Sequence, residues 1–205
     1  MIVLFDVNGT LLDPRAITGS EDGLGILDLT VMQSMVDTMT GQARPFPDYM
    51  RAALQIAGAD VERGLKAAAA LPPYPDARGA LEALRAAGHT PVALTNSAAD
   101  AARSALEAGG LLEHLETVIG ADAVGAYKPD PRVYEHALAE LDAIAGDSWM
   151  VAGHWWDVAG AKRAGLRTAW IARDEGELLS TTPEPDVRAG DLADAAGRIA
   201  AAARP

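Results

Sequence analysis

Short apolar runs alternate with helix-forming segments along most of this 205-residue chain. Each run ends in a polar or glycine-rich turn, and together they occupy residues 2–7 (IVLFDV), 91–97 (PVALTNS), 116–120 (ETVIG), 149–153 (WMVAG) and 167–173 (RTAWIAR). Their length and β-branched content are typical of buried parallel strands, although a short apolar run is also compatible with buried helix. The alternation with helices predicts right-handed strand–helix–strand units and an α/β fold with a doubly wound parallel sheet.

Helical segments with recognisable ends lie between these runs. They occupy residues 76–88, 98–110 and 131–144. The first two stop at a glycine, and the third begins with proline in its first turn. In a doubly wound sheet, ligands bind at the C-terminal ends of the strands. We therefore expect Asp6, Thr95 and Asp157 to meet at that edge.

Residues 13–75 show a different pattern, without a clear strand. Their helical stretches are residues 26–39, 47–58 and 60–71. A cluster of prolines at positions 72, 73 and 75 then marks the return to the alternating pattern. This organisation predicts a helical cap domain at residues 13–75, inserted after the first strand, and a core domain made of residues 1–12 and 76–205.

Composition and charge limit the partners of the chain. The formal net charge of −12 argues against a nucleic-acid partner, which needs a basic surface. The chain has no cysteine, so disulfides, thiolate catalysis and cysteine-bound zinc are excluded. The N-terminus lacks the basic region of a signal peptide, and no stretch approaches the roughly 20 apolar residues of a membrane span. We expect a cytoplasmic protein without a membrane partner. A homodimer is compatible with the sequence.

Two polar motifs follow the first two predicted strands. Residues 6–10 (DVNGT) place Asp6 at a strand end, where a carboxylate can act as a nucleophile while Gly9 allows a tight turn. Alone, this motif also fits a simple turn or helix cap. Residues 95–97 (TNS) form a cluster of small polar side chains. Their alternative role is helix capping, which Ser97 is placed to supply.

Two further motifs come later in the chain. Residues 127–131 (YKPDP) hold Lys128 between a tyrosine and a proline ahead of a helix, where it can bind a negative centre or remain a solvated surface residue. His154, Trp156 and Asp157 follow the run at residues 149–153. Large aromatic side chains at that place are either core packing or a pocket wall. His154 taken alone is more often a structural histidine.

In order, spacing and context, the four motifs together resemble those of the haloacid dehalogenase superfamily. That resemblance covers nearly the whole core and implies a Rossmann-like core with a cap domain, a small-molecule substrate and nucleophilic catalysis by Asp6. The sequences FDVNGTLLD, LTNS, KPDPRVY and VAGHWWDVAGAKRAGL are similar to the type II, or L-2-haloacid, dehalogenase branch, whose motifs run FDAYGTL, LSN, KPDxRVY and SxNxWDxxGA.

The resemblance to that branch implies a role for each matching position. The residues expected to be catalytic are Asp6, Thr10, Lys128 and Asp157. The residues expected to lie near the substrate are Asn8, Thr95, Asn96, Tyr134, His154 and Trp156. In this scheme Lys128 neutralises the nucleophile Asp6 and the charge that develops during reaction. Asp157 orients Lys128 or helps to activate the hydrolytic water.

Asn8 and Gly153 stand where phosphatases of the superfamily carry acids. The resemblance places a proton donor at the first position and a magnesium-binding acid at the second. A phosphoryl group brings several negative charges that Mg²⁺ commonly neutralises, and an alkoxide needs a proton to leave. A halide leaves as a stable anion, so a dehalogenase needs neither group. The sequence therefore predicts a metal-independent 2-haloacid dehalogenase-like hydrolase without a cofactor.

The chain differs from the branch at several positions, so the resemblance does not identify the substrate. Ala152 and His154 stand where the branch has Ser and Asn, and Asn8 stands where it commonly has Tyr. The first cap helix contains no arginine, whereas the branch uses one there to hold halide or substrate carboxylate; Arg15 or Arg44 would have to substitute from a loop.

The methionines of that first cap helix, Met32, Met35 and Met39, are expected mainly to pack, with a substrate-facing role as the alternative. The sequence is also compatible with two alternative functions. One is a small-molecule phosphatase, which would require Mg²⁺. The other is a binding protein that has kept the fold and lost the chemistry.

Overall fold

A single parallel sheet forms the centre of the molecule, for which the computed structural model describes residues 1–202. Its six strands follow the order β3-β2-β1-β4-β5-β6, and every neighbouring pair is parallel. The strands are β1 (Ile2–Phe5), β2 (Thr90–Thr95), β3 (Val118–Gly120), β4 (Trp149–Ala152), β5 (Arg167–Ile171) and β6 (Val187–Ala189). The predicted doubly wound α/β fold is confirmed, and the five apolar runs are β1 to β5. The strand β6 was not predicted, because three residues with an exposed arginine at the centre form no apolar run.

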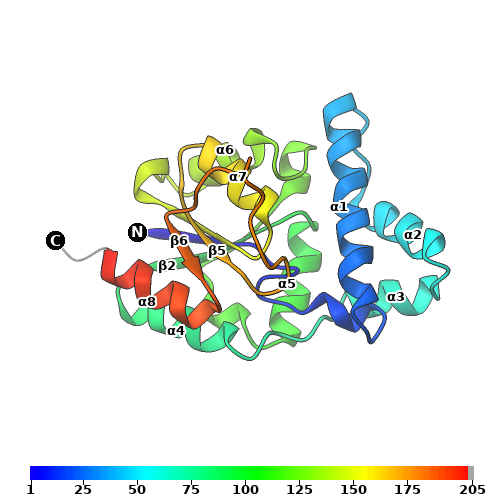
Figure 1. The fold of residues 1–205 in the computed structure, drawn as a ribbon, viewed down its shortest axis with the longest axis horizontal. Helices are drawn as coiled ribbons and strands as arrows, with labels where there is room; N and C mark the ends of the chain where they lie inside the picture. The colour runs from blue at the N-terminus through cyan, green and yellow to red at the C-terminus, as the bar shows by residue number, and fades with distance from the viewer. Residues whose placement is uncertain (203–205) are drawn as a thin grey trace.

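Helices cover both faces of this sheet (Figure 1). On one face, α4 (Ala77–Ala86) packs against β2 and against α8 (Leu192–Ala202). On this same face, α5 (Ala99–Ala108) packs on β3. On the other face, α6 (Pro131–Glu140) packs against α7 (Trp155–Arg163), which contacts β4 and β5. None of the helices in residues 1–202 is long and apolar enough to cross a membrane. The last three residues of the predicted core domain, 203–205, lie outside the described residues.

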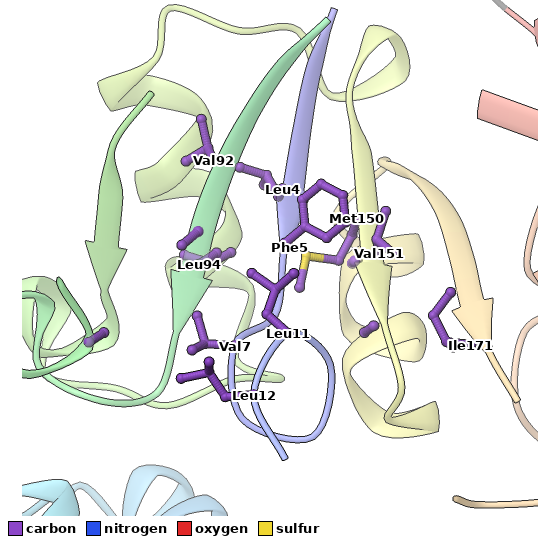
Figure 2. Close-up of a cluster of buried hydrophobic side chains, with 14 of the residues drawn as sticks. Leu4, Phe5, Val7, Leu11, Leu12, Val92, Leu94, Met150, Val151 and Ile171 are labelled. Carbon is purple, nitrogen blue, oxygen red and sulfur yellow. The ribbon is translucent and has the colours of Figure 1, made fainter. Parts of the chain in front are cut away.

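The three central strands pack their apolar side chains into the middle of the core. Figure 2 shows Leu4 and Phe5 of β1 close to Met150 of β4, with Leu94 on the neighbouring β2. Each of these four side chains is at most 1% exposed. Complete burial of side chains of this size stabilises a fold by about 1.5–3 kcal/mol each. The core therefore anchors the C-terminal end of β1, and with it Asp6.

Four helical elements between β1 and α4 form the cap. They are the 3₁₀ helix η1 (Pro14–Ile17), α1 (Asp22–Thr40), α2 (Phe46–Ile56) and α3 (Val61–Ala68). The α1 helix packs against α2, and the group stands beside the C-terminal edge of the sheet (Figure 1). The two segments that link the cap to the core are hydrogen-bonded to each other. Asp13 N donates to Pro72 O at 2.8 Å, and Tyr74 N donates to Leu11 O at 2.9 Å. A helical cap after the first strand is thus confirmed, while domain limits at 12/13 and 75/76 stay predictions.

The packing role predicted for the methionines of α1 is wrong for two of them. Met32 and Met39 are 55% and 83% exposed, and only Met35 packs partly against the core. The buried stripe of α1 instead includes Thr30 and Ser34. Their hydroxyls donate to helix carbonyls at 2.7 Å, so these small polar residues are buried without an unsatisfied group. Met32 and Met39 are therefore exposed, whereas Met35 is half-buried.

A tight contact between α7 and the start of α6 supplies a test of the packing. A Cβ added at Gly160 would lie 2.6 Å from Pro129 Cβ and 2.7 Å from the Tyr134 hydroxyl. We expect Gly160→Ala to lower the free energy of unfolding by about 1–3 kcal/mol, as overpacking does. The exposed helical position Gly79 has no atom within 4 Å of such a Cβ, so Gly79→Ala should be neutral or stabilise by up to about 1 kcal/mol. Urea denaturation compares the two variants, and equal midpoints would contradict the described contact.

Candidate active site

A buried ammonium group joins the C-terminal ends of two neighbouring strands to the start of α7. Lys128 Nζ donates to Asp6 Oδ1 at 2.8 Å, to Asp157 Oδ2 at 2.6 Å and to the Leu94 carbonyl oxygen at 2.9 Å. The side chain is fully buried, and its three N–H donors all have an acceptor. Burial opposes the charge, but the carboxylates of Asp157 and Asp6 outweigh it and raise the pKa of Lys128. Lys128 is therefore a buried cation and not a solvated surface residue.

The polar residues after β2 hold the backbone of this lysine. Asn96 Oδ1 accepts a hydrogen bond from Lys128 N at 2.8 Å. Thr95 Oγ1 accepts from Ser97 N at 3.1 Å and so shapes the turn that presents Asn96. The capping role considered for Ser97 is not observed, because Ala98 is the N-cap of α5 and makes no side-chain bond there. Asn96 thus acts on Lys128, and Thr95 acts on Asn96.

Asp6 is held at its other oxygen by Thr10. The Thr10 hydroxyl donates to Asp6 Oδ2 at 2.8 Å and accepts from Gly153 N at 2.9 Å. The chain reverses between the two residues through Gly9, whose φ of +88° is a conformation that side chains rarely adopt. Asp6 N also donates to Val151 O at 3.0 Å, so the carboxylate is tied to β4 as well. Its position is set by both neighbouring segments of the sheet edge.

Asp157 lies deeper than Asp6 and bridges two buried partners. Its Oδ2 accepts from Lys128, and its Oδ1 accepts from the Tyr134 hydroxyl at 2.6 Å. Asp157 and Tyr134 are both fully buried. Burial and the charge of Asp157 raise the pKa of Tyr134 well above its usual range, so the phenol stays a donor. In this arrangement Tyr134 contacts Asp157, and Asp157 contacts Lys128.

His154 lies near the Asp6 oxygen that Lys128 does not contact. Its Nε2 is 3.0 Å from the Asn8 carbonyl oxygen and 3.9 Å from Asp6 Oδ2, while its Nδ1 is 3.2 Å from Glu175 Oε1. The ring stacks on Trp156 with centroids 5.0 Å apart. Glu175 was missed by the sequence reasoning. The available signal was its place shortly after β5, at the same edge of the sheet as the other acids.

A small cavity of about 60 Å³ lies between the cap and this edge of the core. Its core wall includes Gly9, His154 and Glu175, and its cap wall includes Leu27 and Asp28. A space of that size holds only a few atoms. A larger cavity of about 800 Å³ is lined by cap residues and the segment leading to them, and contains none of the predicted site residues.

The cap wall of the small cavity is acidic, and burial raises the pKa of Asp28. Neither loop arginine pairs with Asp6 within residues 1–202. Arg15 forms ion pairs with Asp13, Glu21 and Asp174. Arg44 is 66% exposed and pairs with Asp37.

The residues beside Asp6 do not fit a metal ion. At Gly153, an added Cβ would lie 2.7 Å from the Gly9 carbonyl oxygen, so the backbone leaves no room for an acidic side chain at this position. The adjacent space is filled by the His154 ring, whose Nε2 is bonded to the Asn8 carbonyl. Within residues 1–202, no group of three or more histidine or acidic side chains is arranged to hold a metal.

The geometry supports nucleophilic chemistry on a small substrate. Asp6 is 4% exposed, and its two carboxylate oxygens accept hydrogen bonds from the Lys128 ammonium group and the Thr10 hydroxyl. A carboxylate that is fixed in this way has lost its freedom to turn, so little reorganisation precedes its attack. Residue 8, two positions further along the chain, is an asparagine and not an acid.

Known proteins resemble this chain in sequence and in fold. A family model described as haloacid dehalogenase-like hydrolase matches residues 1–165. The chain is 35% identical over 189 residues to (S)-2-haloacid dehalogenase 1 of Pseudomonas sp. (strain CBS-3), covering 83% of each chain. It is 34% identical over 168 residues to the phosphoserine phosphatase of Thermus thermophilus, covering 77% of this chain and 66% of that one. The solved L-2-haloacid dehalogenase of Xanthobacter autotrophicus with covalently bound chloropropionic acid shares the fold, with a TM-score of 0.86, 23% identity and 97% coverage of each chain.

The buried cation predicts a large effect of its removal on stability. Lys128→Met leaves the carboxylates of Asp6 and Asp157 facing each other without compensation, and should cost about 3–5 kcal/mol of unfolding free energy. Adding Asp157→Asn to that variant removes one of the two charges and should recover part of the loss. Lys66 on α3 is exposed, so Lys66→Met is the matched control and should change stability by at most about 0.5 kcal/mol. Urea denaturation at pH 7 measures all four proteins, and a Lys128→Met variant as stable as the control would disprove the buried charge set.

Proposed function

The chain belongs to the haloacid dehalogenase-like hydrolases, and from this premise we propose that it is a metal-independent dehalogenase of small 2-haloalkanoates. One observation carries the proposal. The Asp6 carboxylate is held by Lys128 and Thr10 at the edge of the sheet, while residue 8 of the same motif carries an amide and not a carboxylic acid that could protonate a leaving alkoxide. The similarity to an (S)-2-haloacid dehalogenase over 83% of the chain supports the same reaction class.

In the first step, an oxygen of Asp6 attacks C2 of the substrate in line with the carbon–halogen bond. The halide leaves with the bonding electron pair, and an ester forms between Asp6 and the substrate. No proton is needed, since a halide is the anion of a strong acid. Lys128 neutralises one of the negative charges that this approach brings together, in a site where such an interaction is stronger than in water.

In the second step, water attacks the carbonyl carbon of the Asp6 ester. The carbonyl oxygen becomes an oxyanion, and a Lys128 N–H in contact with the Asp6 carboxyl group stabilises it. Cleavage of the acyl–oxygen bond regenerates Asp6 and releases the 2-hydroxy acid, with a proton passing to solvent. Both oxygens of Asp157 are already engaged by Lys128 and Tyr134, which favours an orienting role for Asp157 over water activation.

A phosphatase is the second candidate function, and one observation favours it, the 34% identity to a phosphoserine phosphatase. Assays of phosphoserine and p-nitrophenyl phosphate, each with and without added MgCl₂, separate the two functions. Phosphate release that depends on Mg²⁺, without halide release from any haloacid, would replace the dehalogenase proposal.

Halide release is the direct test of the proposed reaction. The wild-type protein should release chloride from L-2-chloropropionate at the same rate with and without EDTA. Asp6→Asn should abolish release, because the amide is a poor nucleophile. Asp100→Asn on the exposed side of α5 makes the same chemical change away from the site and should keep wild-type activity. Full activity of Asp6→Asn would rule out the assigned nucleophile.

Oxygen labelling tests the ester intermediate. In a single turnover with enzyme in excess in H₂¹⁸O, water attacks the ester carbonyl, so the label should enter Asp6 and not the product. Mass spectrometry of the product and of the peptide containing Asp6 measures both. Label found in the hydroxy acid after this single turnover would indicate direct attack of water on the substrate and would remove the ester step.

A further inference from the structure

His154 is surrounded so that both of its ring nitrogens must donate. Its Nε2 is 3.0 Å from the Asn8 carbonyl oxygen, and its Nδ1 is 3.2 Å from Glu175 Oε1. A carbonyl and a carboxylate only accept hydrogen bonds, whereas a neutral imidazole carries a single N–H. Both contacts are hydrogen bonds only when the ring is an imidazolium.

The neighbours of the ring hold it in this orientation. Trp156 stacks on its face, with an angle of 13° between the two planes. Gly9 packs so closely that a Cβ there would lie 2.4 Å from Nε2. Glu175 is fixed in turn, because its second oxygen accepts from Trp155 N at 2.7 Å. His154 is 8% exposed, so water competes little for its two N–H groups.

The charges around His154 explain why a second cation belongs here. Asp6 and Asp157 carry two negative charges against the single positive charge of Lys128. Asp6 faces the ring from the end of β1, with Oδ2 3.9 Å from Nε2, and Glu175 faces it from the loop after β5. Asp28 on α1 shares the small cavity with His154. The sum over Lys128, His154, Asp6, Asp157 and Glu175 is −2 with a neutral ring and −1 with an imidazolium.

We infer that His154 is a fixed imidazolium that takes the place of a metal ion beside Asp6. It is a positioning residue: it acts through the Asn8 carbonyl and the Gly9 turn, which place Thr10 on the nucleophile, and through its charge on Asp6. The cap offers an acid and not an arginine at this cavity, so the positive charge that an anionic substrate meets comes from the core. This inference uses Asp6 as the nucleophile and in that respect rests on the proposed function.

The protonation of His154 agrees with this geometry. Burial lowers its pKa, but the hydrogen bond to Glu175 and the charge of Asp6 outweigh burial and raise the pKa to about 9. Because this value lies above the ordinary 6.5, the stability gained from the protonated ring is complete below pH 6.5. It is lost as the pH rises through about 9.

Nitrogen NMR of the full-length protein with ¹⁵N-labelled histidine tests the cation without any substrate. Both ring nitrogens of His154 should stay protonated from pH 6 to above pH 8. His89 is an internal contrast, since both of its nitrogens are buried without a hydrogen-bond partner among residues 1–202, and burial lowers its pKa. In Glu175→Gln the midpoint of the His154 titration should fall by at least about one pH unit, as expected when a charged partner is removed. A neutral His154 ring at pH 7 in the wild-type protein would overturn the inference.

Kinetics test the positioning role separately. His154→Gln keeps a donor toward the Asn8 carbonyl but loses the charge, and should lower kcat for L-2-chloropropionate on the order of 10²-fold with a smaller change in KM. The wild-type rate should fall above pH 9, and the Glu175→Gln rate should fall at correspondingly lower pH. Wild-type kcat in His154→Gln would overturn the role even if NMR finds the cation. If the wild-type protein turns over no haloacid, the proposed function fails, while the NMR result still decides the charge of His154.

Discussion

The buried ammonium of Lys128 is the interaction on which the site depends. It binds the carboxylates of Asp6 and Asp157 and the carbonyl of Leu94, so one group connects the ends of β1 and β2 with the first turn of α7. A charge with no exposed surface is stable only because its donors are all satisfied and its neighbours carry the opposite charge. The nucleophile and its counter-charge are therefore held by one structure.

Two cations of different kinds act on the nucleophile. Lys128 is fully buried, and the carboxylates of Asp157 and Asp6 outweigh burial and raise its pKa. His154 lies at the cavity and owes its charge to two acceptors, one of which is a loop glutamate, Glu175. The first is part of the folded core, whereas the second depends on pH and on a surface loop. This difference makes His154 the adjustable member of the pair.

Particular errors show where reasoning from the sequence reached its limit. Hydrophobicity predicts that Met32 and Met39 pack against the core, but both are exposed. Thr30 and Ser34 are buried instead, because their hydroxyl groups donate to carbonyl oxygens of their own helix. Glu175 was overlooked because a single acid in a loop after a strand carries no spacing pattern. Both outcomes depend on which face of an element meets another element, and that is a property of tertiary packing.

The sequence by itself determined strands β1 to β5, the inserted cap and the edge of the sheet at which Asp6, Thr95 and Asp157 lie. The pattern of apolar runs and their order in the chain carry that information, because the C-terminal ends of parallel strands share one edge. Only the tertiary structure decided what each polar group contacts. Distances of about 3 Å between residues more than a hundred positions apart, such as Asp6 and Lys128 or Asn8 and His154, follow from side-chain packing. Hydrogen bonds act only at such distances, so the charge and role of each group became clear from the folded chain and not from its order.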